Sequence, residues 1–135
     1  MPGRSDPVQV TRENVRVPRD EFVAVWHEAD QDGADFLGHE VADWYLSAVV
    51  QTCRWMAATP LRTALCGGLI RSPVTMRSCR ARPELIEAEC RAALQGSEQF
   101  STDVAARPGW CEGVQATFRW AWLRQGPSPI ELRLT

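Results

Sequence analysis

The run HEVADWYLSAVVQTCRWMAA, residues 39–58, constrains the fold more than any other stretch of the chain. Its apolar residues recur at the three- and four-residue spacing of an α-helix and leave only a narrow polar stripe. A helix that is apolar over most of its circumference must be covered by other elements. We therefore expect a central helix that ends at the Thr59-Pro60 step. The two adjacent apolar sets are Val41, Tyr45, Ala48, Val49, Thr52 and Met56, and Leu46, Val50, Cys53 and Ala57.

Part of this run returns near the carboxyl end, because TCRWMA at residues 52–57 is echoed by TFRWAW at residues 117–122. Small residues at matching places would let two helix backbones approach closely, while a tryptophan covers each end of the crossing. We predict two core helices packed with approximate two-fold symmetry. In the alternative, Arg54 and Arg119 hold a carboxylate or phosphate between the helices. The matched pairs are Ala48 with Gly113, Val49 with Val114, Thr52 with Thr117, Arg54 with Arg119 and Trp55 with Trp120.

The remaining segments predict further helices around this pair. A first helix should run from Asp20 to about Glu28 and stop at the turn-rich DQDG, and a third from Pro83 to the Gln95-Gly96 stop. A polar loop then leads to a last helix over residues 108–125. Residues 1–18 are expected to form an extended arm, and the alternating tail IELRLT could add a short strand pairing of the chain ends. The predicted fold is all-α, with about four helices in one domain over residues 19–135.

Composition narrows the class of protein. The 135 residues suit one domain, and 44% apolar with 24% charged residues are ordinary globular values. A net charge of −2 gives no general attraction to nucleic acid or to an anionic membrane. The N-terminus lacks a secretory signal, and no apolar segment is long enough to span a bilayer, so we expect a cytoplasmic protein. Five cysteines without a C-x-x-C pair are typical of reduced, mostly buried thiols.

The segment EADQDGADFLGHE resembles a calcium-binding loop only in its first half. With Gly33 as the turn glycine, acidic residues occupy the first three ligand positions, but the position of the bidentate glutamate is taken by His39. A polar turn between helices is therefore the favoured interpretation. His39 and Asp43 share a helical face one turn apart, which permits a metal site, although surface or capping roles are commoner for such residues.

The densest positive run is RSPVTMRSCRARP, which could hold a phosphate, a nucleic-acid backbone or an acidic partner, although an exposed basic loop without a ligand is the commoner case. Tryptophan and arginine are the residue types that most often contribute binding energy at interfaces. The predicted partner-binding residues are Arg71, Arg77, Arg80, Arg82, Trp44 and Trp110.

Motifs for nucleophilic or phosphate chemistry are absent from the sequence. It contains neither G-x-S-x-G nor a phosphate-cradling glycine loop. A Cys/His site that uses Cys66 or Cys111 would need partners that are close only in space, and nothing in the sequence selects one. No cofactor is expected.

The stretches YLSAVVQTCRWMA, SPVT, ELIEAE and RPGWCEGVQATFRWAW together resemble a group of small, uncharacterised helical proteins from high-GC actinobacteria. The resemblance covers roughly residues 40–130. It implies a cytoplasmic accessory role and brings no known activity, cofactor or catalytic residue.

The sequence thus favours a non-enzymatic protein-interaction module, an accessory or regulatory protein whose partner is another protein or a second copy of the chain. One alternative is a small enzyme or binder, with an anion at Arg54 and Arg119 or a metal at His39 and Asp43. A further alternative, which is not favoured, is a nucleic-acid-binding regulator that uses the basic loop at residues 71–82.

Overall fold

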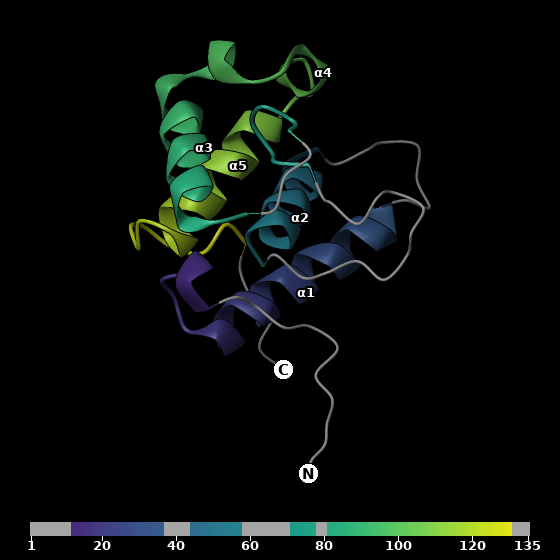
Figure 1. The fold of residues 1–135 in the computed structure, drawn as a ribbon. Coiled ribbons are helices and arrows are strands. Elements are labelled where there is room, and N and C mark those ends of the chain that lie inside the picture. Colours follow the sequence, from purple (N-terminus) through teal and green to yellow (C-terminus); the bar gives the residue numbers. More distant parts are fainter. Residues whose placement is uncertain (1–11, 37–43, 58–70, 78–80, 131–135) are drawn as a thin grey trace, which may run out of the picture.

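A computed structural model describes residues 12–36, 44–57, 71–77 and 81–130 (Figure 1). This part of the chain contains helices and no β-strand, which confirms the all-α prediction. The proposed strand pairing falls largely on residues 1–11 and 131–135, which lie outside the described residues. The α-helices are α1 (Arg19–Phe36), α2 (Trp44–Ala57), α3 (Pro83–Gln95), α4 (Thr102–Ala105) and α5 (Trp110–Ala121), and the 3-10 helices are η1 (Arg12–Asn14) and η3 (Ser97–Gln99).

The crossing of α2 and α5 is the centre of the fold, as the sequence echo predicted. Gly113 on α5 touches α2 so closely that an added Cβ would lie 2.6 Å from the carbonyl oxygen of Tyr45 and 2.8 Å from the Cβ of Ala48. The echo pairs Gly113 with Ala48, so the two matched small residues meet at the crossing. The close approach of the two backbones confirms that the echo is a packing feature.

The matched threonines repeat one local arrangement in both helices. Thr52 donates its hydroxyl to the carbonyl oxygen of Ala48 at 2.7 Å, and Thr117 donates to that of Gly113 at 2.8 Å. Each hydroxyl is fully buried and donates to the carbonyl oxygen four residues earlier. This hydrogen bond offsets the cost of removing the hydroxyl from water. Trp55 and Trp120 are also buried. The charged members of the echo, Arg54 and Arg119, are exposed.

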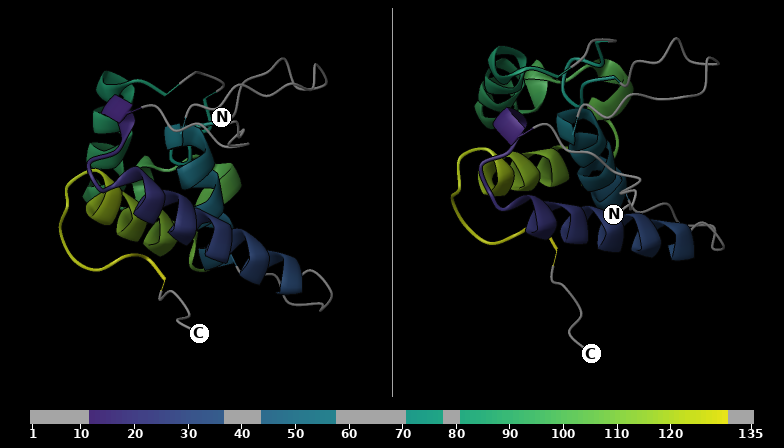
Figure 2. Two further views of the ribbon diagram at one scale, coloured as in Figure 1. Left: turned by 90° about the horizontal axis from the view of Figure 1, so that it is seen from below. Right: turned by 60° about the horizontal axis from the view of Figure 1, so that its bottom comes forward.

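Helix α1 packs against α2, which crosses it in Figure 2, and it reaches α5 through Phe22. Its buried face presents Phe22, Val25 and Ala29, and the ring of Phe22 stacks on that of Trp120 with 5.9 Å between centroids. The ring of Trp26 meets Phe22 edge-on.

The predicted end of this first helix at DQDG is wrong, because α1 continues to Phe36. A glycine inside a helix costs only about 1 kcal/mol relative to alanine, and local turn preference is a weak signal beside an amphipathic face that packs on α2. The favoured interhelical turn is therefore wrong for residues 28–36. The rejected calcium loop is also incompatible with the observed backbone, since residues 28–36 form part of a continuous helix rather than a loop.

Helix α3 has the predicted bounds, with Pro83 in its first turn and Gly96 after its end at φ +137°. It packs against α5 through the buried Ile86, Cys90 and Ala93. Leu94, near the end of the same helix, is exposed. The connection to α5 was expected to be a polar loop, but it contains η3 and α4 and buries Phe100 and Val104.

Helix α5 begins at Trp110, two residues later than predicted, because Gly109 adopts a left-handed φ of +90° that interrupts the helix. It ends at Ala121, and the chain then turns with Arg124 at φ +56°. Of the predicted arm, residues 12–18 are described. This segment starts with η1, buries Val15 and Val17, and donates the Arg16 amide to the carbonyl oxygen of Ala121 at 2.8 Å.

Candidate partner-binding surface

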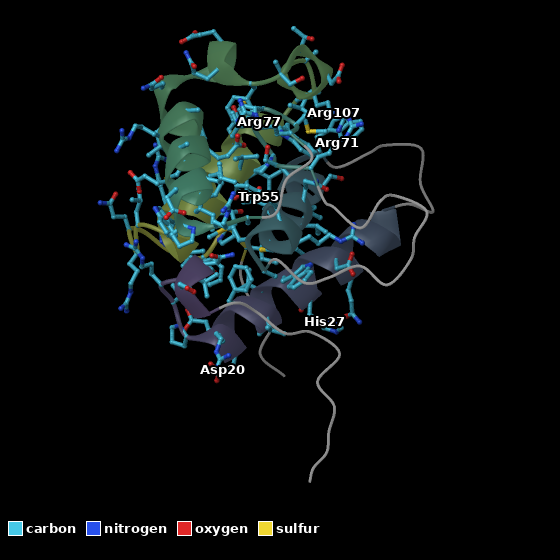
Figure 3. All side chains as sticks on the ribbon, in the orientation of Figure 1. Asp20, His27, Trp55, Arg71, Arg77 and Arg107 are labelled. Atoms are coloured by element: carbon cyan, nitrogen blue, oxygen red, sulfur yellow. The ribbon has the colours of Figure 1, made fainter. Side chains whose placement is uncertain are left out.

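Residues 71–77, named here the basic turn, form a closed loop at the end of the molecule where α4 and α5 begin (Figures 1 and 3). The Ser72 amide donates to the carbonyl oxygen of Arg77 at 2.9 Å, and the Arg77 amide donates to the Ser72 hydroxyl at 3.1 Å. Met76 takes a left-handed φ of +59°, which reverses the chain. Arg71 and Arg77 therefore stand at the two ends of one compact turn.

A buried carboxylate holds the middle of the basic turn. Glu89 on α3 is only 7% exposed, and it accepts hydrogen bonds from the Val74 amide at 2.9 Å and the Thr75 hydroxyl at 2.6 Å. The Thr75 amide adds a longer bond of 3.3 Å. Hydrogen bonds to an ionised acceptor are stronger than neutral ones, and they compensate this carboxylate for the loss of water.

Three further elements bind the backbone of the basic turn. Gln51 on α2 donates its side-chain amide to the carbonyl oxygen of Arg71 at 2.6 Å. The indole N–H of Trp110 donates to the carbonyl oxygen of Pro73 at 3.0 Å, and the Ser101 amide donates to that of Val74 at 2.8 Å. The turn is thus fixed to α2, α3, α5 and the segment before α4, and the buried side chain of Val74 anchors it in the core.

The two arginines of the basic turn are exposed and make no ion pair with another described residue. In the described part of the chain the single ion pair joins Arg91 to Glu87 on α3. The structure therefore presents two guanidinium groups on a backbone that is fixed, with their hydrogen-bonding capacity directed at solvent.

A third arginine, which the sequence analysis did not single out, lies beside the basic turn. The guanidinium carbon of Arg107 is 4.6 Å from the ring centroid of Trp44 and 5.1 Å from that of Trp110. These cation–π contacts join the first residues of α2 and α5. Trp110 contacts both Arg107 and the basic turn, because its ring lies against the Arg107 guanidinium group and its N–H donates to the carbonyl oxygen of Pro73. Arg71, Arg77 and Arg107 gather in the same part of Figure 3.

Gly109 determines where Arg107 lies. A Cβ added to this glycine would sit 3.3 Å from the backbone nitrogen of Tyr45, so the turn before α5 abuts the first turn of α2. That close approach brings Arg107 over the ring of Trp44. The spacing of Arg107 and Trp110 in RPGW was visible in the sequence, but the contribution of Trp44 depends on the tertiary fold.

The other predicted partner-binding residues have different positions. Arg82 precedes α3 and is exposed beside η1, whose Asn14 donates to the carbonyl oxygen of Ala81 at 3.1 Å. Seven residues of helix, about 10 Å, separate it from Glu89 and hence from the basic turn. Arg80 lies outside the described residues. Trp44 is half-buried, whereas Trp110 is buried and contributes to the surface by holding the backbone of the basic turn at Pro73.

The candidate anion residues are exposed, and the candidate metal residues are outside the part of the chain that the structure describes. Arg54 and Arg119 make no side-chain hydrogen bond or ion pair to another described residue, and both are exposed. His39 and Asp43 lie outside the described residues. Within the four described ranges no group of three His, Cys, Asp or Glu side chains could hold a metal ion. His27 is exposed on α1, far from the basic turn in Figure 3.

The described cysteines are free thiols whose surroundings oppose ionisation. Burial raises the pKa of the Cys53 thiol strongly, and it raises that of Cys90 to about 11. Desolvation also raises the pKa of Cys111, with a smaller contribution from Glu112. A raised pKa leaves little of the reactive thiolate near neutral pH, which weakens the case for Cys111 as a nucleophile. Cys66 lies outside the described residues.

Comparison of the chain with protein-family models, with curated proteins and with solved structures gave no match. None of the described helices is both long enough and apolar enough to span a membrane. We therefore infer the function from the residues of the basic turn and its surroundings.

Proposed function

We propose that this chain is a non-enzymatic protein-interaction module, an accessory or regulatory protein of the cytoplasm that binds an acidic partner through the basic turn. The observation that carries the proposal is the combination of two exposed arginines, which form no ion pair with the described residues, and a backbone fixed by hydrogen bonds to four other parts of the fold. Binding to a surface that is already ordered avoids much of the entropy cost of immobilising a loop.

The charge pattern supports recognition by a local surface. The net charge of −2 gives no long-range attraction for polyanions, so positive charge acts only where it is concentrated. Arginine forms bidentate hydrogen bonds with carboxylates, and complementary charge at an interface improves the rate and the specificity of association.

The alternative of a small-molecule site between the central helices has little physical support. The atoms of Gly113, Tyr45 and Ala48 fill the crossing of α2 and α5 so tightly that even a methyl group would clash. Arg54 and Arg119 would have to bind an anion at the outer surfaces of these helices.

The alternative of a nucleic-acid-binding regulator is also weaker than protein binding. Aromatic side chains that bind single strands need an open ring face, but Trp110 is buried and Arg107 occupies a face of Trp44. Unchanged electrophoretic mobility with DNA and RNA at low salt would remove this option, because phosphate contacts are strongest there.

Affinity capture with two charge-matched variants tests the proposal. R71E/R77E reverses the arginines of the basic turn, whereas R54E/R119E reverses two exposed arginines elsewhere and changes the net charge equally. We expect the wild-type chain and R54E/R119E to retain the same partner from the cytosol of its own cell, and R71E/R77E to lose it. A wild-type chain that stays monomeric and retains no partner would refute the proposal, as would equal loss from both variants.

A further inference from the structure

We propose that Arg107 is the residue that recognises a carboxylate in an acidic peptide segment of the partner, with Arg71 and Arg77 binding neighbouring carboxylates. This inference rests on the proposed function and specifies both the partner's chemistry and the residue that selects it.

The position of Arg107 is set before any partner arrives. Two indole rings contact its guanidinium group, and the close approach of Gly109 to Tyr45 fixes the chain on its carboxyl side. On its amino side, the Arg107 amide donates to the carbonyl oxygen of Val104 at 3.0 Å. A long side chain that is already immobilised loses less conformational freedom when it forms a hydrogen bond.

The contacts of Arg107 leave its hydrogen-bond donors unused. A guanidinium group carries five N–H donors in its plane, while an aromatic ring attracts it as a cation without accepting those bonds in the ordinary way. The side chain makes no hydrogen bond or ion pair to another described residue. The acidic residues nearest in sequence, Asp103 and Glu112, are exposed and do not pair with it. A planar, bidentate acceptor such as a carboxylate matches these free donors.

The half-buried setting of Arg107 strengthens such a bond. Neighbouring indole rings exclude water from part of the group, and charges attract more strongly where the effective dielectric constant is lower. Arg71 and Arg77 are more exposed than Arg107, so each should contribute less per contact and act mainly in steering. Arg107 is therefore expected to dominate the affinity.

The arrangement of the three arginines favours an extended acidic segment as the partner. Arg107 lies over the ring of Trp110, and the N–H of the same indole donates to the carbonyl oxygen of Pro73 in the basic turn. Three arginines in one part of the surface complement the several carboxylates that an acidic peptide carries along its length.

Fluorescence anisotropy with a labelled polyglutamate peptide at low salt provides the test. The key variant is R107K, which keeps the charge but lacks the planar fork, and R119K is its control at an exposed site. We expect R107K to weaken binding about tenfold or more, in line with loss of a charge-assisted hydrogen bond. R119K should bind like the wild type. R107A should weaken binding at least as much, and its thermal unfolding would reveal any loss of folding.

Different outcomes separate this inference from the proposed function. If R107K binds the peptide as tightly as the wild type, Arg107 is not the recognition residue and the inference fails. It also fails if the wild-type chain does not bind the peptide, or prefers an oligonucleotide of equal charge, even when capture identifies a protein partner. If the peptide binds in an Arg107-dependent manner but no partner is captured, the proposed function fails instead.

Discussion

Replacing Gly113 by alanine tests the helix crossing on which the described fold depends. The new Cβ would lie 2.6 Å from the carbonyl oxygen of Tyr45 and 2.8 Å from the Cβ of Ala48. Because non-bonded carbon atoms prefer about 3.5–4.0 Å, α2 must move by about 1 Å or lose its register on α5.

The net effect of this replacement is a balance of two terms. Alanine gains about 1 kcal/mol over glycine from helix propensity, while overpacking a dense core costs typically 1–3 kcal/mol or more. The clash is with backbone, which cannot rotate away, so we expect the upper part of that range and a net destabilisation of about 1–2 kcal/mol. The melting temperature should fall by about 3–6 °C per kcal/mol.

Urea unfolding and thermal unfolding followed by circular dichroism would measure this change. Glu112→Ala, at an exposed position on the same helix, is the matched control and should stay within about 0.5 kcal/mol of the wild type. Ala48→Gly removes one of the two clashes but itself costs about 1 kcal/mol of helix propensity, so the loss in A48G/G113A should be smaller than the sum of the two single losses. If G113A is as stable as the wild type or more stable, the backbones of α2 and α5 do not approach each other as closely as described.

Three further predictions concern other buried and charged groups. Glu89→Ala leaves the Val74 amide unsatisfied and should cost about 1–3 kcal/mol in urea unfolding, whereas Glu89→Gln should cost less; equal effects would contradict the hydrogen-bonding role. The hydrogen bond from the indole N–H of Trp122 lowers the pKa of Glu87 from 4.5. The ionised Glu87 carboxylate therefore stabilises the fold above pH 4.5, and this stabilisation is lost as the pH falls through the lower pKa of the folded state. Melting temperatures of wild type and E87Q should therefore converge in acid, and parallel curves would refute the assignment. Cys53 and Cys90, whose pKa values are raised by burial, should react with iodoacetamide near neutral pH only after unfolding; peptide mapping that finds Cys53 labelled in the native protein would contradict its burial.

The helices could be predicted where local signals and packing agree. Pro83 and Gly96 mark the ends of α3 with residues whose backbone preferences are strong, and the observed bounds match the prediction. The DQDG segment carries only weak turn preference, and the packing of α1 on α2 outweighs it. The start of α5 was missed because Gly109 adopts a left-handed φ, which an Arg-Pro-Gly sequence permits without requiring it.

The candidate surface could be predicted only in part. The density of arginine identified Arg71 and Arg77, but no local pattern indicates that Arg82 lies about 10 Å away along α3. Glu89 was missed because it resembles any polar residue on an amphipathic helix, and its burial depends on the fold of the basic turn against it. The role of Arg107 depends on Trp44, which is far away in the sequence. Four of the six tryptophans, Trp55, Trp110, Trp120 and Trp122, are buried, and composition alone could not distinguish core from interface.

An NMR titration of the arginine side-chain Nε–H signals with the polyglutamate peptide would show directly which arginines bind carboxylates. We expect the signals of Arg71, Arg77 and Arg107 to shift together and saturate, while those of Arg54 and Arg119 stay unchanged. Equal shifts at all exposed arginines, or a shift confined to Arg54 and Arg119, would contradict this expectation.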